Sequence, residues 1–180
     1  MEALRQEEYY TYEEWLELDD DVYAELLDGS LYMMASPSRR HQGMITEFTR
    51  QFANFLYGKP CKIYPSPFGV RLAEDTVFLP DITVVCDPSK LNDRGCEGAP
   101  DLVVEILSPS TSRYDMCTKF REYLRAGVKE YWIVDPQTDI LTVHILKDGS
   151  YVTDVYSNTD AAPVKVLPGF EVDLAAVFAE

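Results

Sequence analysis

The sequence predicts an α/β fold in which one mixed sheet, of α+β character, is flanked by helices. Two patterns carry this prediction: β-type segments alternate with two substantial amphipathic helices, and hairpin signatures stand near both ends of the chain. The 180 residues, 46% of them hydrophobic, suffice for one core and are short for two. We therefore expect a single domain spanning residues 1–180.

The first elements have clear local signals. Thr11 and Glu14 form the S/T-x-x-E pattern of a capping box, which predicts a short helix ending near residues 19–21. A strand pair is predicted over 22–35, because Asp28-Gly29 favours a tight type I′ turn.

Two longer helices are predicted from apolar residues at helical spacing. The first covers 37–57, with Ser36 or Ser38 as N-cap. The second covers 113–126, and Gly127 is placed to end it in the left-handed conformation.

The remaining segments have mainly β character. The run 102–107 is almost wholly apolar, which predicts a strand covered on both faces. A loop is expected over 90–99, and a short helix over 174–178. Further strands are expected over 62–64, 69–72, 81–86, 130–135, 140–146 and 151–156, the last two as a hairpin around Asp148-Gly149.

Composition limits the classes of function. The chain holds 31 acidic and 16 basic residues, a net charge of −15, which opposes binding to a polyanion. Residues 1–30 carry −10 of that charge, so the rest of the chain is only mildly acidic. The sequence shows no apolar run of membrane-spanning length and its first ten residues are acidic, so we expect a cytoplasmic protein without membrane contact.

The cysteines are expected to be free thiols. Cys61, Cys86, Cys96 and Cys117 lie far apart in a chain large enough to fold without disulfides. The chain has no CxxC pair and its two histidines are not spaced as a ligand pair, so a zinc site is not expected.

Glu105 is the residue that most strongly suggests chemistry. It lies inside the apolar run 102–107, where an ionised carboxylate is costly to bury without a cation or dense hydrogen bonding. A buried ion pair, or a position at an open sheet end, would explain it without any function. A bound divalent cation explains it if other carboxylates converge on the same point.

Asp81 is the expected second carboxylate. It follows Pro80 and opens the preceding strand, and neighbouring strands can bring two carboxylates to one sheet edge, as hard cations require. Asp101, after a second Pro-Asp step, is a rival ligand. Its alternative role is to cap the strand that contains Glu105, and we prefer Asp81 because Asp101 leaves no separate strand for the second ligand.

These residues resemble the PD-(D/E)XK nuclease superfamily, and the chain resembles its Uma2 group over nearly its whole length. The segments that carry the resemblance are Glu25-Leu-Leu-Asp-Gly, Ser36-Pro37 with His41, Pro80-Asp81-Ile, Glu105-Ile-Leu-Ser-Pro-Ser-Thr, Arg113-Tyr-Asp, Lys119 and Glu130-Tyr-Trp-Ile-Val-Asp-Pro. The resemblance implies a restriction-endonuclease-like core in which Asp81 and Glu105 bind Mg²⁺ or Mn²⁺.

The chain departs from the superfamily pattern at the motif's lysine, because Leu107 stands two residues after Glu105. The resemblance places that lysine on the following helix, at Lys119. A helical wheel puts Lys119 at the edge of an apolar arc that includes Met116, from which it can reach the sheet end. The alternative is a surface ion pair with Asp115, four residues earlier.

Two further residues are assigned by the same comparison. Glu25 resembles an additional acidic residue of the family and is expected to complete the metal coordination; an exposed strand glutamate is the alternative. His41, beside Arg39 and Arg40 near a helix start, is placed to touch phosphate, although a purely structural histidine fits equally.

The expected function is therefore a metal-dependent endonuclease that hydrolyses phosphodiester bonds in DNA. Asp81, Glu105 and Glu25 are the expected metal ligands, and Lys119 is expected to act on the water. The alternative is a catalytically silent module that keeps the nuclease fold for binding or assembly, which the acidity favours. Nucleic acid is the expected partner, and a homodimer is allowed for.

Overall fold

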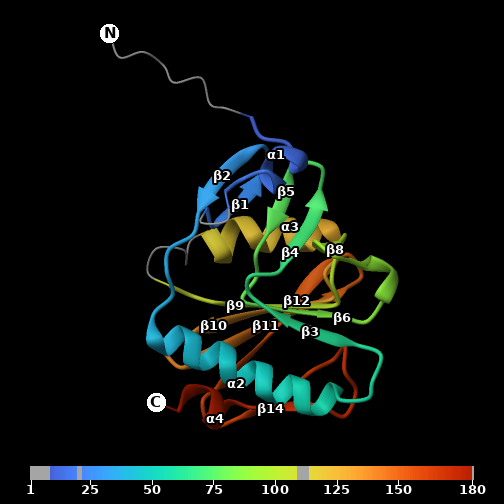
Figure 1. Cartoon of the computed structure of the whole chain (residues 1–180). Helices are drawn as coiled ribbons and strands as arrows, with labels where there is room; N and C mark the ends of the chain where they lie inside the picture. The colour runs from blue at the N-terminus through green and yellow to red at the C-terminus, as the bar shows by residue number, and fades with distance from the viewer. Residues whose placement is uncertain (1–8, 20–21, 109–113, 180) are drawn as a thin grey trace.

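The computed structural model describes residues 9–19, 22–108 and 114–179. Its two main layers are six-stranded mixed sheets, and Figure 1 shows the first sheet above the second. Helix α2 (Arg39–Leu56) covers one face of the second sheet and α3 (Phe120–Ala126) lies on the other. The predicted mixed α+β architecture is confirmed, with two large sheets where one was expected.

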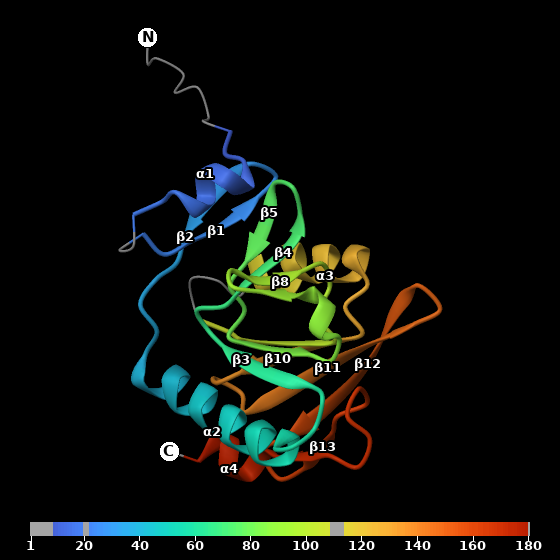
Figure 2. The same ribbon diagram turned by 45° about the vertical axis from the view of Figure 1, so that its right-hand side comes forward.

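The first sheet has the strand order β2-β1-β5-β4-β8-β7. Short helix α1 (Tyr12–Leu16) packs beside it, as Figure 2 shows. Its strands are β1 (Ala24–Leu27), β2 (Ser30–Met33), β4 (Gly69–Ala73), β5 (Thr76–Phe78), β7 (Leu91–Asn92) and β8 (Gly95–Glu97).

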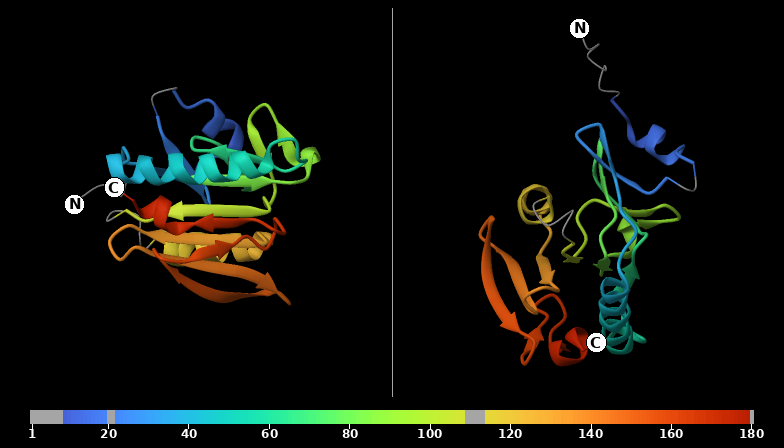
Figure 3. Two further views of the ribbon diagram at one scale, coloured as in Figure 1. Left: turned by 90° about the horizontal axis from the view of Figure 1, so that it is seen from below. Right: turned by 90° about the vertical axis from the view of Figure 1, so that its left-hand side faces the viewer.

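The second sheet has the order β12-β11-β10-β9-β6-β3, and β9 runs parallel to β10 and antiparallel to β6. Figure 3 shows it edge-on, with α2 and α4 (Leu174–Phe178) on the same side. Its strands are β3 (Lys62–Pro65), β6 (Ile82–Val85), β9 (Leu102–Ile106), β10 (Glu130–Asp135), β11 (Ile140–Lys147) and β12 (Ser150–Ser157).

The main core lies between the second sheet and α2. Phe48 and Phe52 of the helix make edge-on contacts with Trp132 of β10, and all three side chains are fully buried. On the other face, Tyr123 of α3 packs among Phe78 and Tyr131. The strand β9 is therefore covered on both faces, as its apolar run predicted.

Local signals at the N-terminal elements are confirmed. Glu14 donates its backbone N–H to the Thr11 hydroxyl and accepts the Thr11 N–H in return, which completes the capping box. The Ser38 hydroxyl accepts the N–H of the third residue of α2. Asp28 and Gly29 both have positive φ angles, 47° and 75°, as a type I′ turn requires.

The expected loop over 90–99 is wrong, because β7 and β8 form a tight hairpin there after the short 3-10 helix η1 (Pro88–Lys90). The Asn92 side chain accepts two backbone N–H groups and stabilises the turn. Strands of two or three residues lack the alternation that predicts longer ones. For the same reason β5 and the pair β13 (Ala161–Pro163) and β14 (Glu171–Asp173) were not predicted.

The expectation of four free thiols is wrong for Cys61 and Cys86, which form a disulfide. Strands β3 and β6 pair antiparallel with Lys62 opposite Val85, so the two cysteines that flank this pair face each other. A spacing of 25 residues gave no sign of this register. Cys96 and Cys117 are free.

The second predicted helix is divided in two. Its first described part is a π-helix, η2 (Tyr114–Lys119), and α3 continues from it to Ala126. Gly127 ends α3 with a φ of 86°, as predicted. The predicted start at Arg113 lies outside the described residues.

Candidate functional site

Asp81 and Glu105 lie opposite each other at one end of the second sheet. The antiparallel register pairs Ile82 with Val104, so the next pair along the strands is Asp81 and Glu105. Asp81 is also fixed from its partner strand, because its Oδ2 accepts the backbone N–H of Ile106 at 2.7 Å. The predicted convergence of these two carboxylates at one sheet edge is confirmed as geometry.

Lys119 lies at the centre of a buried ion cluster. Its Nζ is 2.8 Å from Glu25 Oε1, 2.9 Å from Glu105 Oε1 and 3.4 Å from Asp115 Oδ1. The lysine side chain is 1% exposed, so the alternative of a surface ion pair with Asp115 is wrong. A single cation on the helix thus faces carboxylates from both sheets and from its own helical segment.

Tyr123 completes the surroundings of Glu105 by donating its hydroxyl to Oε1 at 2.9 Å. Asp115, Lys119 and Tyr123 are spaced four residues apart and form the buried stripe of the helical segment. The expected apolar arc is wrong at Met116, which is 54% exposed. The wheel placed Lys119 at the edge of this arc, within reach of the sheet end, and the structure buries it there against the carboxylates.

Glu25 joins the cluster from β1 of the first sheet. It is fully buried, so the alternative of an exposed strand glutamate is wrong. Its Oε1 accepts the backbone N–H of Leu79 at 2.9 Å in addition to the lysine contact. Its Oε2 is buried and has no hydrogen-bond partner among the described residues, which leaves that oxygen available to a proton or a cation.

Burial and charge shift the protonation of this cluster in opposite directions. Burial raises the pKa of Glu25, and it raises the pKa of Glu105 well above its usual range. Burial also disfavours the charged form of Lys119, but the facing carboxylates, Glu105 foremost, outweigh it and hold the lysine pKa well above its ordinary value. Lys119 is therefore held in its charged form, whereas burial favours the protonated form of Glu25 and Glu105.

His41, in the first turn of α2, contacts Asp81. Its Nε2 is 3.2 Å from Asp81 Oδ2 and 3.1 Å from the carbonyl oxygen of Ile106. Burial alone would lower the His41 pKa, but the hydrogen bond to Asp81 raises it above its ordinary value. The histidine therefore supports a predicted metal ligand from the helix side of the sheet.

Asp101 is not part of this constellation. Its Oδ2 accepts the backbone N–H of Cys86 at 2.7 Å, and its Oδ1 is 2.6 Å from Nζ of Lys129. It precedes β9, whereas Glu105 lies near the strand's other end. The alternative role as a strand-entry cap is thus the one that the structure shows.

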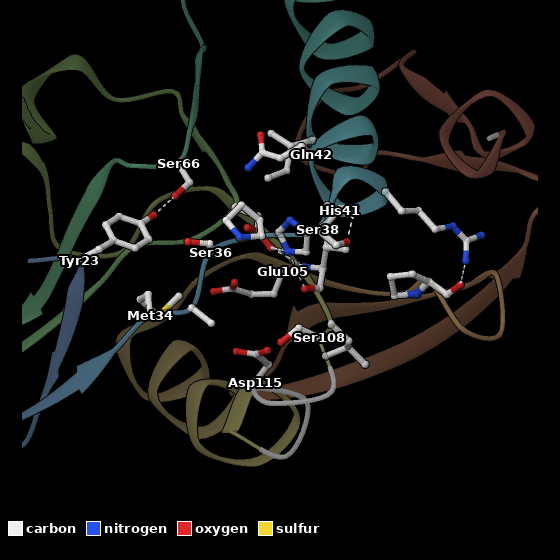
Figure 4. A pocket seen from close by; sticks show the side chains of 18 of the residues that line it. Tyr23, Met34, Ser36, Ser38, His41, Gln42, Ser66, Glu105, Ser108 and Asp115 are labelled. Carbon is white, nitrogen blue, oxygen red and sulfur yellow. Dashed lines mark hydrogen bonds and ion pairs between the residues drawn. The ribbon is translucent and has the colours of Figure 1, made fainter. Parts of the chain in front are cut away.

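A cavity of about 490 Å³ opens over the carboxylates. Figure 4 shows Glu105 and Asp115 pointing into it, with Tyr23 on one side and His41 on the other. Asp81, Leu107, Ser108 and Lys119 also line it. Tyr23 was not singled out from the sequence, and Asp115 was named only within a family segment and as a surface partner of Lys119 at i,i+4 spacing.

The donor set fits a hard divalent cation of the magnesium type. Among the described residues no group of three or more His, Cys, Asp or Glu side chains is arranged to hold a metal ion. Mg²⁺ typically uses one or two carboxylates and completes its shell with water and substrate phosphates. Asp81 and Glu105 supply such a pair at the cavity wall. Glu25 does not line the cavity, but it contacts the same lysine nitrogen as Glu105.

Comparisons with known proteins agree with this fold. Residues 6–175 match the model of the Uma2 family, described as "putative restriction endonuclease". An uncharacterised Synechocystis protein, slr1290, is 30% identical over 91% of this chain and 87% of its own length. A second, sll1609, is 25% identical over 62% of this chain and 66% of its own length.

A solved structure is also similar: the crystal structure of "a putative nuclease belonging to DUF820" from Anabaena variabilis. It aligns with a TM-score of 0.78 at 20% identity, covering 94% of this chain and 97% of that one. This similarity confirms the restriction-endonuclease-like fold. No helix within the described part of the chain is long and apolar enough to span a membrane.

Proposed function

Because the chain belongs to the Uma2 family, we propose that it is a metal-dependent endonuclease that hydrolyses phosphodiester bonds in DNA. The observation that carries this proposal is the excess of buried acid at the sheet end. Lys119 faces three carboxylates and offsets the charge of one. Uncompensated buried charge costs several kcal/mol, roughly, so protons or a cation must join the cluster.

A divalent cation fits that requirement better than protons alone. Asp81 and Glu105 line a cavity that a hydrated ion and a phosphate can enter. Oxygen ligands of this kind suit Mg²⁺ or Mn²⁺ better than they suit softer metals. We assign Asp81 and Glu105 as metal ligands and Glu25, through its free oxygen, as the acid that completes the site directly or through water.

When bound, the metal would lower the pKa of a coordinated water and offset charge on the phosphoryl oxygens. Lys119 stays protonated because of the facing carboxylates, so we assign it to orient the attacking water and to stabilise negative charge in the transition state. It does not serve as the base. His41 and Tyr123 hold Asp81 and Glu105, respectively, in place.

A non-catalytic binding or assembly module is the second candidate, and the net charge of −15 favours it. A silent descendant of a nuclease has no need for a buried lysine among three carboxylates, because such a cluster stabilises less than apolar packing of equal volume. The intact cluster therefore favours the catalytic proposal.

The test is metal binding followed by cleavage. Calorimetry should show Mn²⁺ binding to the wild-type chain and at least about tenfold weaker binding to Asp81→Asn and Glu105→Gln. Asp101→Asn is the matched control, because it removes an acid that lies outside the cavity. Wild-type affinity in both site variants, or no cleavage of plasmid or single-stranded DNA with either metal, would refute the proposal.

A further inference from the structure

The charged side chains of the site are recessed. Glu105 and Asp115 are each 3% exposed and Lys119 is 1% exposed. Asp81 and His41, which also line the cavity, expose only 15% and 13% of their side chains. A phosphate must therefore pass into the cavity before it meets these groups.

The cavity is of the size that takes a small molecule. Its volume of about 490 Å³ falls within the range of about 300–1,000 Å³ that is typical of ligand pockets. In a duplex, the stacked bases and the second strand flank the backbone, so they would have to enter the cavity together with it. A single nucleotide unit of an unpaired strand can enter alone, as enzymes that act inside such pockets require.

The cavity walls suit an unstacked base. One wall carries the Tyr23 ring, whose hydroxyl is hydrogen-bonded to Ser66. Aromatic and apolar side chains bind bases through their flat faces regardless of sequence. Polar edges are available from Gln42 and Gln137. The apolar lining besides Tyr23 includes Met34, Pro37, Ile45, Pro67 and Pro136.

The charges of the lining oppose a duplex more than a single strand, because a duplex carries about twice the phosphate charge per unit length. Three lining residues are basic, and each already contacts an acid: Arg40 is paired with Asp139 at 2.8 Å, His41 with Asp81, and Lys119 with its cluster. Duplex affinity depends on Lys and Arg side chains that are free to neutralise several phosphates. This cavity offers instead base contacts and, on the proposed function, a metal-held phosphate.

We propose that the substrate is an unpaired nucleic-acid strand, one nucleotide of which inserts into the cavity against Tyr23. This inference rests on the proposed function and specifies its substrate class. Single strands, overhangs and unpaired bubbles are substrates, and a fully paired duplex is a poor one.

The experiment compares three end-labelled DNA substrates of one sequence with the full chain and Mn²⁺: a single strand, a blunt duplex, and a duplex with a central unpaired bubble. Cleavage of the single strand, and of the bubble within its unpaired bases, should be at least about tenfold faster than cleavage of the duplex. Tyr23→Ala should raise KM for the single strand about tenfold, since stacking is lost. Tyr23→Phe should keep near wild-type KM, because it removes only the hydroxyl.

Tyr57→Ala is the matched control, because that ring is 91% exposed and lies outside the cavity. Equal or faster cleavage of the duplex would overturn the inference while leaving the nuclease proposal intact. If no substrate is cleaved, the proposed function fails, and fluorescence anisotropy in Mn²⁺ still decides the inference. Tighter binding of the single strand, weakened by Tyr23→Ala, would support it; equal binding of the duplex would overturn it.

Discussion

Lys119→Met is the most informative single change, because it removes the charge and keeps much of the side-chain volume. The wild-type Nζ lies between three carboxylates that are themselves almost wholly buried. After the change, Glu25, Glu105 and Asp115 face one another without a compensating cation. The structure therefore predicts a loss of stability as well as a loss of activity.

The magnitude follows from the geometry. Two unit charges 2.8 Å apart attract by about 6 kcal/mol at an effective dielectric constant near 20. Desolvation cancels much of that gain, and removing one partner of a buried pair costs about 3–5 kcal/mol in practice. We expect a loss in this range near pH 8, together with a fall of about 100-fold or more in turnover.

The loss of stability in Lys119→Met should depend on pH. Without the lysine, the folded-state pKa values of Glu25 and Glu105 rise further above those of the unfolded chain. The folded variant then binds more protons than the unfolded one, so its stability falls as the pH rises. The gap between wild type and variant should be smaller at pH 5 than at pH 8.

Urea unfolding at both pH values measures these differences, and cleavage is assayed well below the unfolding midpoint. Combining Lys119→Met with Glu25→Gln should recover part of the stability, because one unpaired charge is removed. Equal unfolding midpoints for wild type and Lys119→Met at pH 8 would show that the ion cluster is not buried as described. Wild-type turnover in the variant would remove Lys119 from the mechanism.

Three further outcomes are expected. Mg²⁺ at about 100 times its Kd should stabilise the wild type by about 2.7 kcal/mol in thermal unfolding, and Glu105→Gln should lose this gain. Neutralising the exposed Glu13, Glu17 and Asp19 should tighten nucleic-acid binding at low salt, with no change at high salt, in a filter-binding titration. Burial lowers the His144 pKa, so its contribution to stability is full above about pH 6.5 and is lost as the pH falls. His144→Phe should therefore show a smaller drop in Tm than wild type between pH 7.5 and pH 5.5, and an equal drop would contradict that assignment.

The second sheet was largely predictable because its strands carry strong local patterns. The apolar run around Glu105 and the β-branched run after Asp81 identified two adjacent central strands, and their register then places both acids at one edge. The first sheet was less predictable, since several of its strands have only two or three residues. Their pairing depends on partners distant in the sequence.

The environment of the site was harder to predict than its residues. Glu25 and Asp115 are ordinary surface residue types. Nothing near them in the sequence shows that the first sheet will pack against the end of the second. Burial is a tertiary property, and here it decides their charge state. Because burial depends on the tertiary fold, the sequence pattern placed Lys119 at the edge of an amphipathic helix and did not show that it is buried.

The position of the lysine links the site to the packing of the two sheets. Leu107 shares the strand face of Glu105 by period-two alternation and lines the same cavity. The side chain of a lysine at position 107 would extend from the same sheet that carries Glu105. Lys119 instead approaches from the helical segment and contacts Glu25 of the first sheet and Glu105 of the second through one nitrogen. A loosening of the contact between the sheets would separate Glu25 from that nitrogen, so the placement of the proposed catalytic cation depends on the tertiary fold as a whole.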